Sequence, residues 1–219
     1  MTKPIIFCDF DGTITKSDNI ISIMKQFAPP EWEGVKDDIL SQKVSIQDGV
    51  TTLFSLLPSS KQKEITDFIL KKAEIREGFA DFISFVKESG IKLYIVSGGI
   101  DFFVVPLLKG FVEEELVFCN ESDFTGENIK ILWPHSCDEN CTNNCGCCKP
   151  SLMRRLAKEG DKTIVIGDSI TDLQAAKIAD KVIARDFLKE KCKELNIHFE
   201  PFETFYDVIE ILKRLEVKA

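Results

Sequence analysis

The amino-acid sequence predicts an α/β fold, in which helices cover an open parallel sheet and a helical cap is inserted after the first strand. Three short apolar runs lie far apart in the chain, at residues 4–13, 91–99 and 162–172. Apolar runs without alternation are typical of strands buried on both faces. Amphipathic helical stretches separate these runs, and strands that alternate with helices favour right-handed βαβ units.

The segment after the first strand differs from the rest of the chain. Residues 16–77 contain helical stretches such as NIISIMKQF and SIQDGVTTLFSLL, and no convincing strand. We therefore assign residues 1–15 and 78–219 to the core and residues 16–77 to the cap. The cap is expected to lie over the carboxyl ends of the strands, where open α/β sheets bind their ligands.

The remaining elements follow in chain order. A helix is expected after the cap, because Phe79, Phe82 and Val86 share one helical face, and Gly90 is its expected C-cap. Further along, the sequence predicts a strand and hairpin over 115–133, a helix from Pro150 to Gly160, weaker strands at 181–185 and 197–199, and a closing helix over 203–216.

Composition and charge disfavour several classes of function. The 219 residues are 44% hydrophobic, with 36 acidic and 28 basic side chains and a formal net charge of −8. This charge disfavours non-specific binding to nucleic acid or to an anionic membrane. No apolar run is long enough to cross a bilayer, and the N-terminus does not resemble a signal peptide. We expect a cytoplasmic protein with a small-molecule ligand.

Acidic residues end two of the three predicted strands. Asp9 and Asp11 lie two apart, so both side chains can face one ligand, and Asp168 would approach the same place. At about 4 Å and an effective dielectric near 20, each pair of carboxylates repels by roughly 4 kcal/mol. Bound Mg²⁺ removes this repulsion and suits carboxylates plus a phosphate. Ser97 and Lys149 would supply donors to the phosphate, and Lys149 lies at an expected helix N-terminus.

Each of these residues also has an ordinary structural interpretation. Asp11 and Gly12 could form a turn, and Lys149 could be a solvated lysine at a helix start. Asp172 could close a Ser-x-x-Asp capping box that begins at Ser169. Their occurrence in order, each after a strand or before a helix, favours the catalytic interpretation.

Together these features resemble the four motifs of the haloacid dehalogenase superfamily of phosphohydrolases, which span residues 9 to 172. The resemblance implies a Rossmann-like core and Mg²⁺-dependent hydrolysis of phosphomonoesters through an aspartyl-phosphate. It implies that Asp9 is the nucleophile and that Asp11 is the general acid and base. It further implies that the carboxylates of Asp9 and Asp168 and the backbone carbonyl of Asp11 bind the metal, with Asp172 in its second shell.

The substrate phosphate would be bound by Ser97, Gly98 and Lys149. Within the superfamily, the stretches FCDFDGTIT, SGGIDFFVVPLL, CGCCKPS and IGDSITDLQAAKIAD resemble the methionine-salvage phosphatases. That resemblance implies conversion of 2-hydroxy-3-keto-5-methylthiopentenyl-1-phosphate to 1,2-dihydroxy-3-keto-5-methylthiopentene. A phosphoserine phosphatase-like enzyme is the alternative, although the cap has no arginine before Arg76 to hold a substrate carboxylate.

A cysteine-rich loop, residues 135–149, ends at Lys149. It contains His135 and five cysteines, namely Cys137, Cys141, Cys145, Cys147 and Cys148. A structural metal such as Zn²⁺, free or reversibly oxidised thiols, and local disulfides are all open interpretations. Because the loop ends at Lys149, we expect its shape to determine where that lysine points. A third class of function is a metal-binding or interaction module, carried by these cysteines on a phosphatase scaffold.

Overall fold

A seven-stranded sheet organises the chain in the computed structural model, which describes residues 3–216. The strand order is β4-β3-β2-β1-β5-β6-β7, and every neighbouring pair is parallel except β3 and β4. The strands are β1 (Ile5–Cys8), β2 (Lys92–Ile100), β3 (Val117–Asp123), β4 (Lys130–Leu132), β5 (Thr163–Gly167), β6 (Lys181–Ala184) and β7 (Glu200–Pro201). The predicted α/β class is therefore confirmed.

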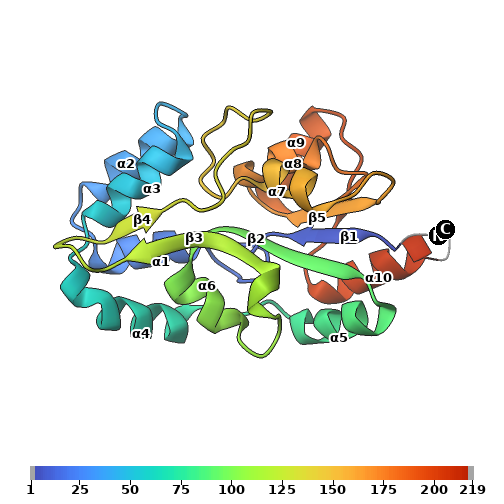
Figure 1. Cartoon of the computed structure of the whole chain (residues 1–219), viewed down its shortest axis with the longest axis horizontal. Helices are drawn as coiled ribbons and strands as arrows, with labels where there is room; N and C mark the ends of the chain where they lie inside the picture. Colours follow the sequence, from blue (N-terminus) through green and yellow to red (C-terminus); the bar gives the residue numbers. More distant parts are fainter. Residues whose placement is uncertain (1–2, 217–219) are drawn as a thin grey trace.

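Helices cover both faces of this sheet. Figure 1 shows α5 (Phe79–Ser89), α6 (Asp101–Leu108) and α10 (Phe205–Glu216) on one face, and α7 (Lys149–Leu156), α8 (Leu173–Ala176) and α9 (Asp186–Glu194) on the other. Successive side chains of β1 point to opposite faces of the sheet. Ile6 and Cys8 belong to the cluster that contains Phe205, whereas Ile5 and Phe7 belong to the cluster that contains Leu152. This burial on both faces explains the unbroken apolar run.

Four helices and a short 3₁₀ turn lie between β1 and α5. They are α1 (Asn19–Phe27), α2 (Trp32–Leu40), α3 (Ile46–Ser55), η1 (Ser59–Lys61) and α4 (Gln62–Lys72). In Figure 1 they gather at one end of the sheet. Two backbone hydrogen bonds tie this segment to the β3–β4 hairpin, from Ser59 to Glu127 and from Ile129 to Leu57, both 2.9 Å long.

Local details agree with most sequence expectations and correct a few. Gly90 ends α5 in the left-handed region, with φ of 60°, and α7 has its proline in the first turn, where no N–H is needed. The expected strand at 197–199 is wrong: Ile197 and Phe199 pack on α9 instead, and pairing begins at Glu200. No helix of the described residues is both long and apolar enough to cross a bilayer.

Candidate active site

Three carboxylates meet at the carboxyl ends of two neighbouring strands. Asp9 directly follows β1 and Asp168 directly follows β5, and these strands pair in parallel with Cys8 opposite Ile166. Carboxylate oxygens of Asp9, Asp168 and Asp172 all lie within 4.8 Å of one another. The structure thus brings two predicted metal ligands together and adds Asp172 to them. The carboxylate of Asp11 is not in this group.

Lys149 is a buried cation between two of these carboxylates. As the first residue of α7 it points its amine into the cluster, where Nζ donates to Asp9 Oδ1 at 2.5 Å, to Asp172 Oδ1 and to Thr171 Oγ1 at 3.3 Å. Burial opposes its charge, but the carboxylates of Asp172 and Asp9 outweigh that effect and raise the Lys149 pKa above its ordinary value. The amine therefore stays charged and can attract a phosphate.

The carboxylate cluster fits a hard divalent cation. Asp9 Oδ2 is buried and has no hydrogen-bond partner among the described residues, and such an orphaned acceptor is unfavourable unless a ligand satisfies it. When all three carboxyl groups are ionised, the one lysine leaves two negative charges unbalanced. A single Mg²⁺ would neutralise them. Burial raises the pKa of Asp9 to about 6 and that of Asp168 to about 9. A cation at this position would reverse both shifts.

Asp11 lies beside this cluster in a different environment. Its Oδ1 accepts hydrogen bonds from the side-chain amide of Asn19 at 2.7 Å and from the Asn19 backbone at 3.1 Å, and Ser97 Oγ lies 3.4 Å from Oδ2. Burial first, and then the charges of Asp18 and Asp9, raise the pKa of Asp11 to about 8. A carboxyl group that holds its proton near neutral pH is suited to protonate a leaving group.

Asn19 is a site residue that the sequence analysis missed. Its side chain is fully buried, and it starts α1 directly after the N-cap residue Asp18. The signal was an asparagine next to a helix cap, a place where polar residues usually serve the helix itself. In the fold this position faces Asp11 instead.

Two glycines of the motifs are required by the close approach of carboxylates. Gly12 has φ of +81°, and a Cβ there would lie 2.3 Å from Asp168 Oδ2. A Cβ on Gly167 would lie 2.4 Å from the carboxyl carbon of Asp172. Both contacts are far below van der Waals distance, so the glycines allow the carboxylates to reach the end of the sheet.

Asp172 forms the capping box that the sequence suggested and also accepts a hydrogen bond from Lys149. Its Oδ2 accepts the backbone N–H groups of Asp168 at 3.1 Å and Ser169 at 3.0 Å, and a capping box with Ser169 is present. Its Oδ1 accepts from Lys149. This capping box thus orients the fully buried carboxylate of Asp172, which also binds the Lys149 amine.

Ser97 and Gly98 lie at the carboxyl end of β2, next to β1. Ser97 is fully buried and its Oγ accepts the N–H of Gly99 at 2.8 Å. Gly98 lines the same cavity as Asp9, and its carbonyl accepts the side chain of Asn120 at 2.8 Å. Of the predicted phosphate-binding residues, Gly98 thus lines the cavity, Ser97 lies beside Asp11, and Lys149 contacts Asp9.

A cavity of about 550 Å³ opens from these carboxylates toward the cap. Apolar side chains of the cap form much of its wall, namely Ile20, Ile21, Trp32, Ile39, Val50 and Leu53. Three lysines, Lys16, Lys25 and Lys36, also line it, and none of the described residues that line it is an arginine. Arg76 lies elsewhere, with its guanidinium donating to the carbonyls of Gly12 and Thr13 at 2.6 and 2.7 Å.

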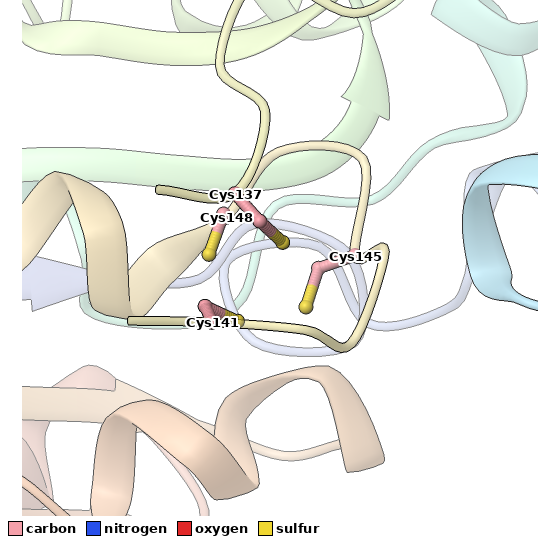
Figure 2. A group of neighbouring side chains, drawn as sticks. All are labelled: Cys137, Cys141, Cys145 and Cys148. Carbon is pink, nitrogen blue, oxygen red and sulfur yellow. The ribbon is translucent and has the colours of Figure 1, made fainter. Parts of the chain in front are cut away.

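The cysteine loop places four of its five thiols together. Cys137, Cys141, Cys145 and Cys148 have their Sγ atoms within 4.8 Å of one another. Figure 2 shows the four side chains converging from the loop and from the start of α7. Cys147 does not join them, because its thiol turns to the carbonyl of Phe118 at 3.6 Å. Each of the eight cysteines, all of them within the described residues, carries a free thiol.

Comparison with known proteins agrees with this geometry. The haloacid dehalogenase-like hydrolase family matches residues 6–177. A protein of Geobacillus kaustophilus named 2-hydroxy-3-keto-5-methylthiopentenyl-1-phosphate phosphatase is 62% identical over 99% of both chains. A protein of Geobacillus thermodenitrificans with the same name is 62% identical over 98% of both. Phosphoserine phosphatase from T. onnurineus has a similar fold, with a TM-score of 0.73 at 17% identity over 97% of this chain and 95% of that one.

Proposed function

This chain belongs to the haloacid dehalogenase-like hydrolases, and from that premise we propose that it is the Mg²⁺-dependent phosphatase of 2-hydroxy-3-keto-5-methylthiopentenyl-1-phosphate. The product is 1,2-dihydroxy-3-keto-5-methylthiopentene, and the pathway is methionine salvage. The observation that carries the substrate assignment is the 62% identity, over nearly the whole of both chains, to proteins of that name. The enzyme acts on a small phosphorylated molecule in the cytoplasm, and neither nucleic acid nor membrane takes part.

The two aspartates of the first motif divide the reaction between them. One oxygen of Asp9 attacks phosphorus and forms an aspartyl-phosphate, while the bond from phosphorus to the substrate oxygen breaks. Asp11, which holds a proton near neutral pH, gives it to the departing oxygen. Asp11 then takes a proton from water as that water attacks the aspartyl-phosphate, and phosphate and the free Asp9 carboxylate are released.

The surrounding groups stabilise the charge that this reaction moves. Lys149 donates to Oδ1 of Asp9 and so orients this carboxylate for attack, whereas the unpartnered Oδ2 would be the oxygen that binds Mg²⁺. The Lys149 amine, the Ser97 hydroxyl and the backbone N–H of Gly98 bind the phosphoryl oxygens. The carboxylates of Asp9 and Asp168 would hold Mg²⁺, which when bound neutralises the negative charge of carboxylates and phosphate.

The lining of the cavity supports a phosphate ester with a methylthio tail as the substrate. Its floor is charged, whereas the wall that the cap provides is rich in branched aliphatic side chains and includes the ring of Trp32. A phosphate at the floor would place an apolar tail against this wall, where burial is favourable by about 25 cal/mol per Å². The cavity offers no arginine to the carboxylate of phosphoserine, which would have to pair with one of the three lysines of the wall instead.

A side-by-side assay tests the substrate. Release of phosphate is measured with Mg²⁺ from the methylthiopentenyl phosphate, phosphoserine and a generic aryl phosphate. We expect kcat/KM for the first to exceed the others by at least about a hundredfold, because several apolar groups are recognised together. A flat profile across the three would contradict the substrate while leaving a phosphatase of this family, and a preference for phosphoserine would favour the alternative enzyme.

Two metals are proposed at separate places. Hard carboxylate oxygens suit Mg²⁺, whereas soft thiolates suit Zn²⁺, so we assign zinc to the cysteine loop and magnesium to the aspartates. Only the magnesium site touches the substrate phosphate.

A further inference from the structure

The cysteine loop has the geometry of a tetrathiolate metal site that the proposed chemistry does not use. We propose that one Zn²⁺ bound by Cys137, Cys141, Cys145 and Cys148 folds this loop and thereby positions Lys149 and the cap. Zn–S bonds of about 2.3 Å at tetrahedral corners place sulfurs about 3.8 Å apart. The observed four, all within 4.8 Å of one another, need only a small contraction to reach this arrangement.

Cys147 provides an internal comparison for this cluster. It lies in the same loop and next to Cys148 in sequence, yet its buried thiol faces the carbonyl of Phe118, away from the four. A loop that merely contained many cysteines would not sort them in this way. The backbone turns that separate them are specific: Asn144 and Gly146 adopt φ of 52° and 80°. The sorting indicates a ligand at the common centre.

A hydroxyl supports one of the proposed ligands from outside. Ser151 Oγ donates to Cys148 Sγ at 3.0 Å and accepts the backbone N–H of Asp138 at 2.9 Å. Such a bond favours the thiolate form of Cys148, which also lies at the N-cap of α7, where negative charge is stabilised. Outer contacts that orient a sulfur and balance its charge are typical of zinc sites.

Regular secondary structure does not hold the shape of the loop. Within residues 133–148 no helix or strand is formed, and the thiols at its two ends, Cys137 and Cys148, are brought into contact by folding. Closing such a loop is entropically unfavourable, and a metal whose binding is coupled to folding offsets this directly. Two disulfides could also close it, but they would replace the common centre by two separate sulfur pairs.

The position of the cluster connects it to the active site. Cys148 directly precedes Lys149, so a fixed sulfur at Cys148 fixes the start of α7 and the direction of the catalytic lysine. On the other side, the Asn144 carbonyl accepts the N–H of Gln47 at 3.2 Å, and its amide lies 3.5 Å from Ser45 Oγ, at the N-cap of α3. The ion would therefore hold together the core, the lysine and a helix that lines the cavity.

The test begins with the metal itself. Protein purified with a thiol reductant is analysed by inductively coupled plasma mass spectrometry, and its zinc is replaced by Co²⁺ for absorption spectroscopy. We expect about one zinc per chain and the intense sulfur-to-cobalt charge-transfer bands of tetrahedral thiolate coordination. Iron in place of zinc, a chain that takes up no zinc when supplied with it, or two disulfides in the alkylated protein would each overturn the proposal.

Variants assign the ligands with a matched control. Cys141→Ser should lose the zinc and the cobalt bands, whereas Cys147→Ala, in the same loop but outside the cluster, should retain both. Full zinc content in Cys141→Ser and Cys137→Ser would contradict the site. The metal content and cobalt spectrum of the wild-type protein test the site even if a substituted chain misfolds.

The second half of the inference, that the ion positions Lys149, rests on the proposed function and has its own measurement. Zinc loss should weaken inhibition by inorganic phosphate and lower kcat/KM by roughly 10- to 100-fold, because the lysine amine is displaced. The Mg²⁺ concentration for half-maximal activity should not rise, since displacement of the Lys149 amine removes a positive charge from beside Asp9. Unchanged phosphate inhibition in the zinc-free enzyme would contradict this role. An enzyme without phosphatase activity that still binds zinc would instead refute only the proposed function.

Discussion

Asn19 donates two hydrogen bonds to one oxygen of Asp11, from its side-chain amide at 2.7 Å and from its backbone N–H at 3.1 Å. The contact joins the first cap helix to the proposed general acid and base. Both bonds favour the charged form of Asp11 and so oppose the rise in its pKa that burial causes. Asn19 is thereby placed to tune when Asp11 gains and loses its proton.

Asn19→Ala should therefore change the pH dependence of turnover. Loss of the side-chain bond raises the pKa of Asp11 further, so the basic form needed for the second step is reached only at higher pH. We expect kcat to fall about tenfold at neutral pH and the acidic limb of the pH–rate profile to move upward. A merely structural role would lower the melting temperature but leave the profile in place, so the two are measured together.

Asp9→Asn tests the nucleophile. An amide oxygen is a poor nucleophile, so we expect turnover to fall by more than about a thousandfold. The fold should persist, because the substitution removes a buried charge from a crowded carboxylate cluster. Circular dichroism and thermal melting are the controls, and unchanged turnover in the folded variant would end the assignment of Asp9.

Mg²⁺ should stabilise the protein more at high pH than at low pH. Without metal, burial raises the pKa of Asp168 to about 9 and that of Asp9 to about 6, above the value of about 4 in an unfolded chain. The folded state then holds protons that the unfolded state releases. This contribution to stability is present at low pH and lost as pH rises through the folded-state pKa values.

Because Mg²⁺ binds the deprotonated carboxylates, it offsets that loss. We expect calorimetry to show a larger rise in Tm with saturating Mg²⁺ at about pH 8 than at about pH 5. Asp168→Asn should remove most of the increment at the higher pH. Equal increments at both pH values in the wild type would show that these carboxylates do not bind the ion.

Two glycine substitutions form a matched pair. Gly12→Ala places a Cβ 2.3 Å from Asp168 Oδ2 in a left-handed backbone, whereas a Cβ on Gly34, exposed in α2, meets nothing within 4 Å. We expect Gly12→Ala to abolish measurable turnover and Gly34→Ala to keep it while gaining about 0.5–1 kcal/mol in unfolding free energy. Retained activity in Gly12→Ala would show that Asp168 can move without loss of function.

The sequence by itself determined the sheet and the core of the site. Unbroken apolar runs at residues 5–8 and 163–167 mark strands that are buried on both faces, and the acidic residues directly after them come together because parallel neighbours end at one edge. Lys149 was found because it precedes a proline at a helix start. Each of these signals is local, because it can be recognised in a short stretch of sequence without knowledge of the rest of the fold.

Only the tertiary structure decided which of many similar residues reach the site. Asn19 looked like an ordinary residue beside a helix cap until the cap segment brought it to Asp11, and four cysteines were separated from Cys147 by the turns of an irregular loop. Trp32 joined the cavity wall through the way α2 packs. Such choices depend on contacts between segments far apart in the chain, whose direction is set by packing of the whole molecule and leaves no periodic pattern in the sequence.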